Sequence, residues 1–386
     1  MTFEDESTSP SAAPLSTQEL CAWLKAELDI DAQSADEIGD GNLNLVYRVR
    51  TSDGSVIVKQ ALPYLRLAGE GWPLTVDRAR IEATALSLHN ELSPGGVPNL
   101  IHFDADQHLI VMEDLRDHVI WRQTLIDGSL PAGMGAQVGE ITARITLGTS
   151  DVLVPADNRK QLLKDFVNPE LCAISEDLVF TSPYIDSPSN NIDDSSRELA
   201  ERLRRDSELF AESKRLLWAF KTQGEALIHG DLHTGSVMVT DGDARVMDPE
   251  FAFYGPIGYD TGNVLAHLAF ASTRHDLLGN QEQVKLITEE ALTFWEVFVE
   301  TIAELWPDSE PWQETFLARV LEDSASYAAT EMIRRMVGMA QVADIESLEL
   351  PQRYEAKQRI GRNARWLALG RPVRTVEELW DRAIHD

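Results

Sequence analysis

Apolar residues in the first third of the chain repeat with both strand and helix periods. A Ser-x-x-Glu sequence at residues 16–19 precedes apolar positions at helical spacing, which predicts a capped helix. Residues 37–60 contain two apolar stretches around an Asp-Gly turn, a pattern typical of a β-hairpin. A helical pattern then runs from about 76 to 92, and short apolar runs follow at 100–103 and 109–112. This order of elements predicts a small α+β lobe.

After residue 113 the apolar spacing becomes mostly helical. Two short strand patterns interrupt it, at 237–240 and 245–247. The sequence therefore predicts an α+β, bilobal, protein-kinase-like fold with a small β-rich N-lobe and a mostly helical C-lobe. We place a disordered tail at 1–15, the N-lobe at 16–113 and the C-lobe at 114–386. The predicted C-lobe helices lie at about 134–147, 159–175, 195–223, 281–304, 312–340 and 352–369.

The amino-acid composition argues against several classes of function. The 386 residues include 34 basic and 64 acidic side chains, giving a net charge of −30 that argues against nucleic-acid or anionic-membrane partners. No run approaches the ~20 apolar residues that a membrane span needs. The N-terminus lacks the basic flank of a secretory signal. Cys21 and Cys172 form no metal-binding or redox spacing, so a reduced cytoplasmic location is favoured, with a disulfide left as the alternative.

The strongest chemical signal is a pair of motifs around the two short strands. His229-Gly230-Asp231-Leu232-His233 precedes them, and Asp248-Pro249-Glu250 follows them. Phosphoryl transfer needs one carboxylate at the attacking hydroxyl, for which Asp231 is the candidate. It also needs carboxylates that hold Mg²⁺ against the phosphates of ATP, a role suited to Asp248 and Glu250. The alternative, turn residues with solvated acids, is disfavoured by the order of the two motifs.

A glycine-rich segment before the hairpin is the second signal. Small residues allow a backbone to approach phosphates, and asparagine side chains add hydrogen-bond donors. A turn without any ligand is the alternative interpretation. The candidate nucleotide-binding residues here are Gly39, Asp40, Asn42 and Asn44.

A lysine and an arginine pair are notable in so acidic a chain. Lys59 ends an apolar strand, where it either faces solvent or contacts the ATP phosphates, with Glu82 or Glu70 as its ion-pair partner. Arg334 and Arg335 lie in an otherwise apolar helix. Adjacent helical positions point about 100° apart, so a surface pair with one arginine facing solvent is the alternative. The apolar helix and the acidic chain favour a site in which both arginines serve hydroxyls and phosphoryl oxygens.

The His-Gly-Asp-x-His motif resembles the catalytic loop of aminoglycoside phosphotransferases and choline kinases. Two positions depart from that general pattern: Ser236 replaces the usual metal-binding Asn, and Asp248-Pro249-Glu250 replaces Asp-Phe-Gly. The glutamate compensates for the serine as a metal ligand. This combination, together with Asp-Gly-Asn-Leu-Asn at 40–44, is similar to the 5-methylthioribose kinase family. The resemblance spans about 37–368 and is weaker at 150–200.

The resemblance implies an activity and further site residues. It implies ATP- and Mg²⁺-dependent phosphorylation of the anomeric hydroxyl of 5-methylthioribose, a step of methionine salvage, by a homodimer. Asp231, His233, Arg334 and Arg335 would contact the sugar, and the backbone at Glu113, Asp114 and Leu115 would contact adenine. Pro249 would lie with the metal ligands at the nucleotide. Asp260, which begins an apolar helix, would either brace the catalytic loop or cap that helix.

Two rival functions remain on sequence grounds. The first is another small-molecule kinase of the same fold, acting on an aminoglycoside, choline or homoserine. A cationic acceptor needs an acidic or aromatic cage, whereas an arginine pair suits a neutral polyol. The second rival is a nucleotide-binding protein without catalysis, which is disfavoured because Lys59, Asp231, Asp248 and Glu250 are all present.

Overall fold

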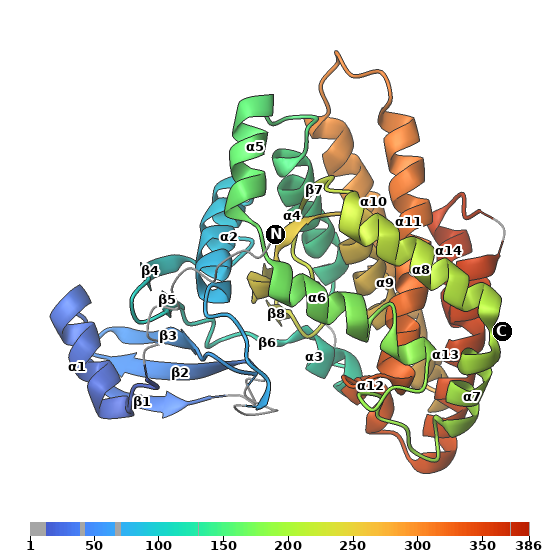
Figure 1. Ribbon diagram of the computed structural model, residues 1–386, viewed down its shortest axis with the longest axis horizontal. Coiled ribbons are helices and arrows are strands. Elements are labelled where there is room, and N and C mark those ends of the chain that lie inside the picture. Colours follow the sequence, from blue (N-terminus) through green and yellow to red (C-terminus); the bar gives the residue numbers. More distant parts are fainter. Residues whose placement is uncertain (1–12, 39–42, 66–70, 130, 371, 386) are drawn as a thin grey trace, which may run out of the picture. The chain divides into compact units, whose positions relative to one another are not determined.

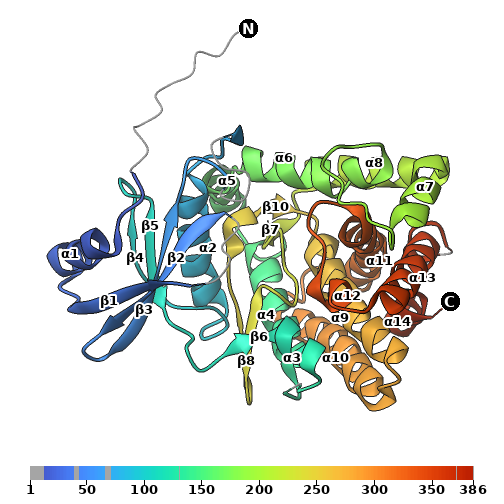
Figure 2. The same cartoon turned by 90° about the horizontal axis from the view of Figure 1, so that it is seen from below.

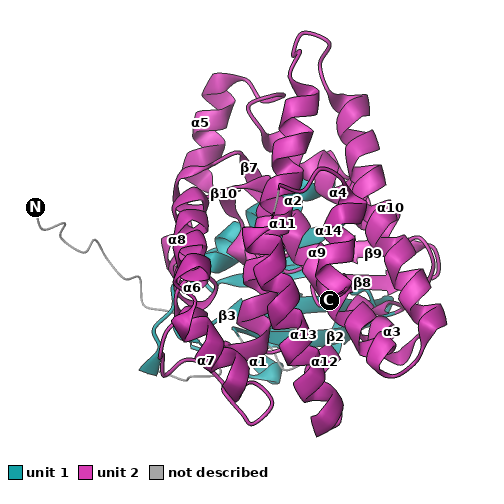
Figure 3. Ribbon diagram, turned by 90° about the vertical axis from the view of Figure 1, so that its right-hand side faces the viewer, with its two compact units in different colours: residues 1–91, 97–116 teal, residues 92–96, 117–386 magenta. Residues whose placement is uncertain are grey.

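The computed structural model describes residues 13–38, 43–65, 71–129, 131–370 and 372–385. The chain divides into two compact units (Figure 3): unit 1 comprises 1–91 and 97–116, and unit 2 comprises 92–96 and 117–386. The lobe boundary that we placed from the sequence lies between residues 113 and 114. Of the segments singled out in the sequence, most of the predicted tail lies outside the described residues.

Unit 1 is built on a five-stranded antiparallel sheet in the order β1-β2-β3-β5-β4 (Figure 1). The predicted hairpin is confirmed as β2 and β3. Strand β1 was not predicted, because its sequence, Ala-Gln-Ser-Ala-Asp-Glu, lacks the apolar alternation of a half-buried strand. It pairs with β2 at the edge of the sheet. The strands are β1 (Ala32–Glu37), β2 (Asn44–Thr51), β3 (Gly54–Ala61), β4 (Leu100–Asp104) and β5 (Leu109–Glu113).

The two faces of this sheet carry different partners. Helix α1 (Thr17–Leu28), which begins with the predicted capping box, buries Leu20 and Leu24 in one cluster with Val58 of β3. Successive strand residues point to opposite faces, so Lys59 lies on the face opposite Val58. Its side chain meets helix α2 (Arg78–Leu92) there. The alternation of β3 therefore separates an apolar face from a charged one.

Unit 2 is mostly helical, and its centre is α9 (Ile257–Leu277), which is buried from Ile257 to Thr273 (Figure 2). Two predicted helices are each divided in the structure. The 159–175 prediction corresponds to α5 (Ala156–Asp165) and α6 (Pro169–Leu178), because proline suits only the first turn of a helix. The 195–223 prediction corresponds to α7 (Arg197–Arg205) and α8 (Ser207–Thr222), with Asp206 capping α8. The remaining helices are α3 (Trp121–Asp127), α4 (Met134–Thr149), α10 (Gln281–Leu305), α11 (Gln313–Val337), α12 (Ala343–Glu346), α13 (Leu350–Leu369) and α14 (Val376–Ile384).

Helix α11 runs very close to α9. A Cβ atom added at Gly262 would lie 2.5 Å from the carbonyl oxygen of Ser324, so only glycine permits this approach. The approach lets Glu331 of α11 reach His267 of α9, with 2.9 Å between Oε1 and Nε2. Helix packing therefore places the buried carboxylate of α11 against His267 of α9.

Two small sheets hold the segments that carry the two motifs. Strand β7 (Ala226–Ile228) pairs with β10 (Phe253–Gly255), and β8 (Val237–Thr240) pairs with β6 (Val119–Ile120) and β9 (Asp243–Val246). The loop at 229–236 thus leaves β7 and enters β8, while residues 247–252 connect β9 to β10. Among the described residues, no helix is both long and apolar enough to span a bilayer, and both cysteines are free.

Candidate active site

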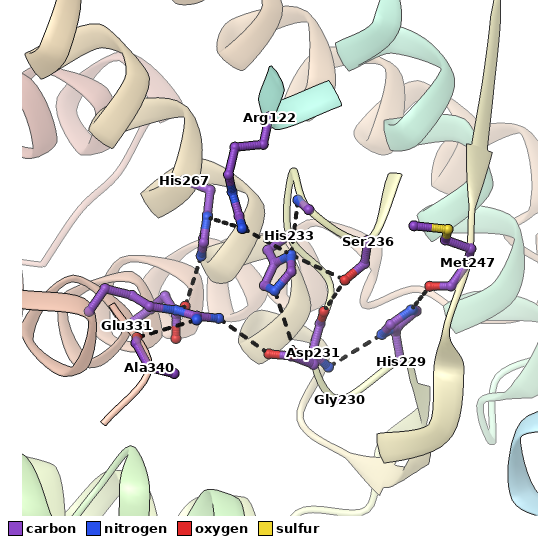
Figure 4. A network of polar contacts seen from close by, with 12 residues as sticks. Arg122, His229, Gly230, Asp231, His233, Ser236, Met247, His267, Glu331 and Ala340 are labelled. Atoms are coloured by element: carbon purple, nitrogen blue, oxygen red, sulfur yellow. Dashed lines mark hydrogen bonds and ion pairs between the residues drawn. The ribbon is translucent and has the colours of Figure 1, made fainter. Parts of the chain in front are cut away.

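The loop at 229–236 is fixed to the Asp248 segment by a histidine. His229 Nε2 lies 2.8 Å from the carbonyl oxygen of Met247, and its Nδ1 accepts a hydrogen bond of 3.3 Å from the backbone N–H of Asp231 (Figure 4). A carbonyl oxygen only accepts, so the ring donates through Nε2 to Met247 and accepts through Nδ1 from Asp231. Gly230 has φ +81°, and a Cβ atom there would overlap the backbone of Phe251. The motif spacing therefore reflects direct contact between the two motifs.

Two side chains outside these segments hold them in place, one from helix α9 and one from the residue before α6. Asp260 accepts hydrogen bonds from the backbone N–H groups of His229, at 2.6 Å, and Gly230, at 3.1 Å. Of its two expected roles the structure shows the brace, since Pro256 occupies the cap position of α9. Burial raises the pKa of Asp260 to about 6. Asn168, before α6, donates to the carbonyl oxygens of Glu250 and Ala252.

Asp231 lies against both predicted arginines. Its Oδ1 accepts from Arg334 Nη2 at 2.9 Å and lies 3.6 Å from Arg335 Nη2. Its side chain keeps 30% exposure, so it is reachable from solvent. Burial alone would raise the pKa of Asp231, but His233 and the two arginines outweigh burial and hold the pKa well below its usual value. Asp231 is therefore a carboxylate at neutral pH.

Both arginines turn inward, with 11% and 7% of their side chains exposed, so the alternative of a solvent-facing surface pair does not apply. Glu331, which is fully buried, accepts from Arg334 Nε at 2.5 Å and from Arg335 Nε at 2.6 Å. Residues three and four positions apart lie on the same face of a helix, so one glutamate reaches both arginines despite their divergence. Burial would raise the pKa of Glu331, but the two arginines and His267 hold it well below its usual value.

His233, the fourth predicted substrate residue, joins this group. Its Nε2 lies 3.5 Å from Asp231 Oδ2, and its Nδ1 accepts from the backbone N–H of Gly235 at 3.0 Å. Two residues that the sequence analysis missed complete the network: Arg122 of α3 and His267 of α9. Neither lies near the motifs in sequence, so no spacing signal pointed to them.

The candidate metal residues follow β9. Asp248 adopts a left-handed backbone conformation (φ +63°), which is uncommon for a residue with a side chain and is found at functional sites. Pro249 and Glu250 form a short 3₁₀ turn directly after it, and both are buried. The described residues contain no cluster of three or more metal-ligating side chains. Two carboxylates match what Mg²⁺ requires, because this ion is completed by waters and phosphates.

Ser236 does not act as a free donor in the loop. Its hydroxyl donates to the carbonyl oxygen of Asp231 at 2.9 Å and contacts His233 Nδ1 at 3.1 Å. The side chain is also buried. A hydroxyl occupied in this way braces the loop.

In unit 1, Lys59 pairs with Glu82, one of its two expected partners. The Nζ–Oε1 distance is 2.5 Å and both side chains are buried, while the other candidate, Glu70, lies outside the described residues. Asn44 lies at the start of β2, where its Oδ1 accepts from Arg78 Nε at 3.0 Å. Arg78 and Glu82 are four positions apart on α2, so one helical face holds both the end of the glycine-rich segment and Lys59. Of that segment, Gly39, Asp40 and Asn42 lie outside the described residues.

At the end of β5, the acidic side chains of the predicted adenine segment are already engaged. Asp114 accepts two hydrogen bonds from Arg48, at 2.8 and 3.1 Å, and a third from Ser55. Glu113 accepts from the backbone and side chain of Asn99, and Leu115 is buried. The backbone, rather than these carboxylates, is therefore the part of the segment suited to a base.

Comparison with known proteins defines the class of the chain. Residues 34–295 match the family described as "Phosphotransferase enzyme family". That match covers more than half of the chain and includes both motifs. The chain belongs to this phosphotransferase family.

Individual relatives indicate which members of this family the chain belongs with. The chain is 41% identical over 358 residues to the methylthioribose kinase of Yersinia pseudotuberculosis serotype O:1b, covering 88% of this chain and 86% of that protein. It is 42% identical over 342 residues to the methylthioribose kinase of Geobacillus sp. WCH70, covering 85% and 84%. Among solved structures, spectinomycin phosphotransferase with ADP and spectinomycin is similar with a TM-score of 0.49 at 15% identity, covering 95% of this chain and 100% of that one. The sequence relatives show that, within the phosphotransferases, the chain belongs with the methylthioribose kinases, which confirms the family resemblance. The small antiparallel sheet of unit 1 and the mostly helical unit 2 confirm the α+β fold class.

Proposed function

We propose that this chain transfers the γ-phosphoryl group of ATP to the anomeric hydroxyl of 5-methylthioribose. The product is 5-methylthioribose 1-phosphate, an intermediate of methionine salvage. Identity above 40% to methylthioribose kinases over most of the chain supports the substrate. The observation that carries the chemistry is Asp231, a solvent-reachable carboxylate held ionised against two buried arginines.

Asp231 would orient the sugar hydroxyl and accept its proton. Its low pKa makes it a weak base, so it would not deprotonate the hydroxyl in advance. In a loose phosphoryl-transfer transition state the proton moves late, after the bond between the γ-phosphorus and the bridging oxygen has largely broken. The sugar oxygen then bonds to phosphorus, its proton passes to Asp231, and ADP departs. Arg334 and Arg335 would bind sugar oxygens and the developing charge, with His233 beside them.

Candidate nucleotide-binding residues occur in each of the two units. In unit 1 these are Gly39, Asp40, Asn42, Asn44, Lys59 and the backbone of residues 113–115. In unit 2, Asp248 and Glu250 would hold Mg²⁺, with Pro249 fixing the turn between them. The ion supplies neutralisation of phosphate charge, and Asn168 holds the backbone of this turn in place.

A coupled assay of ADP release tests the proposal directly. Purified protein is offered 5-methylthioribose, choline, homoserine and an aminoglycoside at equal concentrations, with ATP and Mg²⁺. We expect turnover with the methylthio sugar to exceed the others by at least about a hundredfold in kcat/KM, which corresponds to two charge-assisted contacts. Preference for any other acceptor, or turnover with none, would reject the assignment.

Replacing Arg334 with lysine should impair the sugar and spare the nucleotide. Arg334 contacts Glu331 through Nε and Asp231 through Nη2, and a single ammonium cannot span both. Losing one charge-assisted bond costs roughly 1.5–3 kcal/mol, or about ten- to a hundredfold in kcat/KM for the sugar. Arg319→Lys is the matched control, because Arg319 lies on the same helix and pairs with Glu225 instead. A defect confined to the KM for ATP would contradict this role, as would equal effects in the two variants. The same assay applied to Arg335→Lys tests the second arginine.

The Mg²⁺ requirement should depend on Glu250 more than on Ser236. Glu250→Gln removes a carboxylate from the proposed ion site, whereas Ser236→Ala removes a hydroxyl that donates to the Asp231 carbonyl. Activity titrated with Mg²⁺ at fixed ATP should require about tenfold more metal in the first variant, the effect of losing roughly 1.4 kcal/mol of binding. A larger shift for Ser236→Ala would show that the serine is the second ligand.

The family resemblance also leads us to propose a cytoplasmic homodimer. Light scattering during size-exclusion chromatography tests the oligomeric state, with a mass of twice the 43.1 kDa chain expected.

A further inference from the structure

Arg122 occupies an unusual position in the network around Asp231. Its backbone N–H donates to the carbonyl oxygen of Thr234, and a Cβ atom added at Gly235 would overlap its guanidinium group. One nitrogen, Nη2, lies 3.3 Å from His233 Nδ1 and 3.2 Å from His267 Nδ1 (Figure 4). Its nearest carboxylate, that of Asp344, is 3.5 Å from Nε. The guanidinium is therefore directed at two imidazole rings more closely than at an anion.

This geometry determines where the imidazole protons lie. A guanidinium group only donates, so both Nδ1 atoms must be unprotonated acceptors. The proton of His267 then lies on Nε2, which donates to Glu331 at 2.9 Å. His233 Nδ1 also accepts from the backbone N–H of Gly235 at 3.0 Å, so both donors place the proton of His233 on Nε2, 3.5 Å from Asp231 Oδ2. A fixed cation at Nδ1 also opposes the addition of a second proton to either ring.

We propose that Arg122 is a positioning residue that keeps His233 neutral and directs its Nε2–H toward Asp231. The proposal rests on the proposed function, in which Asp231 receives the proton of the sugar. Asp231 already has two arginines beside it, and a protonated His233 would add a third cation and weaken the carboxylate further as a base. A neutral His233 offers a hydrogen-bond donor without that charge.

The charges facing His233 support this assignment. The pKa of His233 is lowered to about 4, chiefly by burial; Asp231 opposes this shift, and Arg122 and Arg335 contribute to it. Burial also lowers the pKa of His267 well below its usual value, with Arg122 and Arg335 acting in the same direction. Asp344 is the remaining titratable group beside Arg122, and burial raises its pKa to about 6. Removing Arg122 should therefore raise the pKa of both histidines.

The first test uses the unmodified full-length protein. Two-dimensional ¹H–¹⁵N spectra of the histidine ring nitrogens report which nitrogen carries the proton at each pH. We expect His233, assigned with a His233→Gln variant, to remain in the Nε2–H form from pH 8 to pH 5.5. Titration of His233 near pH 6.5, or a proton on Nδ1, would overturn the proposal. Because the spectra involve no substrate, this result is independent of whether the sugar has been identified correctly.

The second test compares Arg122→Gln with Arg274→Gln. Arg274 donates to the carbonyl oxygen of Asp344 and to Ser347, so it contacts the same segment but neither histidine. In the spectra of Arg122→Gln we expect His233 to titrate at higher pH than in the wild type. The acid limb of the kcat–pH profile should move to higher pH in the same variant, and kcat at pH 7 should fall about ten- to a hundredfold. The KM for ATP should not change. Arg122→Lys, which keeps the charge, should restore part of the shift.

Titration of Asp344 could also move the acid limb of the kcat–pH profile. It would not change the titration of His233, so the histidine spectra distinguish the two causes. A wild-type titration of His233 in Arg122→Gln, with losses of activity and stability equal to those of Arg274→Gln, would show that Arg122 only packs the loop. If Arg122→Gln does not fold, the wild-type spectra and Arg122→Lys still decide the question.

Discussion

Asp231→Asn should abolish measurable turnover while leaving ATP binding within about threefold of wild type. The asparagine keeps the size of the side chain and can still accept from Arg334, but it cannot take up the sugar proton. Loss of a general base costs roughly 10²–10⁴-fold in kcat. Nucleotide affinity is expected to survive, because Lys59, Asp248 and Glu250 are untouched. Turnover by coupled assay and affinity by calorimetry should be measured on the same preparation.

The matched control for this variant is Asp243→Asn. Asp243 also accepts from an arginine and a histidine, Arg245 and His118, in the same unit but outside the catalytic loop. Its replacement should cost some stability and little activity. Turnover of Asp231→Asn within tenfold of wild type would remove Asp231 from the catalytic role.

The fold could be predicted well where local patterns determine it. The capping box at Ser16 and Glu19 and the turn of the β2–β3 hairpin are local signals, and both are present in the structure. Strand β1 was missed because a polar edge strand is defined by its partner, not by its own alternation. The two divided helices show the same limit. The helical spacing of apolar residues continues across Pro169 and Asp206, but in the structure one helix ends and another begins there.

The site divides in a similar way between local and tertiary information. Asp231, Asp248 and Glu250 lie in contiguous motifs whose spacing indicates their chemistry. Arg122 and His267 enter the site only because α3 and α9 pack against the loop, and no pattern along the chain encodes that packing. Glu331 lies between these two cases. Its position three and four residues before the arginine pair was visible in the sequence, but an ion pair within a helix is usually a surface feature.

Glu331 should be among the most sensitive positions for stability. Glu331→Gln leaves the guanidinium groups of Arg334 and Arg335 with the partly exposed Asp231 as their ion-pair partner among the described residues. Removing one partner from a buried ionic group typically costs about 3–5 kcal/mol. We expect a loss of this size in urea unfolding, together with a raised KM for the sugar, because the arginines are no longer held in place. Glu225→Gln is the control, since Glu225 also pairs with an arginine of α11, Arg319, but lies outside the network.

The pH dependence of that loss provides a specific test. The folded-state pKa of Glu331 is held well below its usual value, so its contribution is fully present above the unfolded pKa and disappears as pH falls through the folded one. The stability difference between wild type and Glu331→Gln should therefore narrow on acidification below about pH 4.

Sulfate should stabilise the variant more than the wild type, because an anion can compensate the arginine charge that Glu331 no longer neutralises. Adding Arg335→Gln to Glu331→Gln should recover part of the lost stability, since a buried cation is removed along with its partner. A double variant as unstable as the sum of the two single variants, with no extra response to sulfate, would show that Glu331 acts through packing and not through its charge.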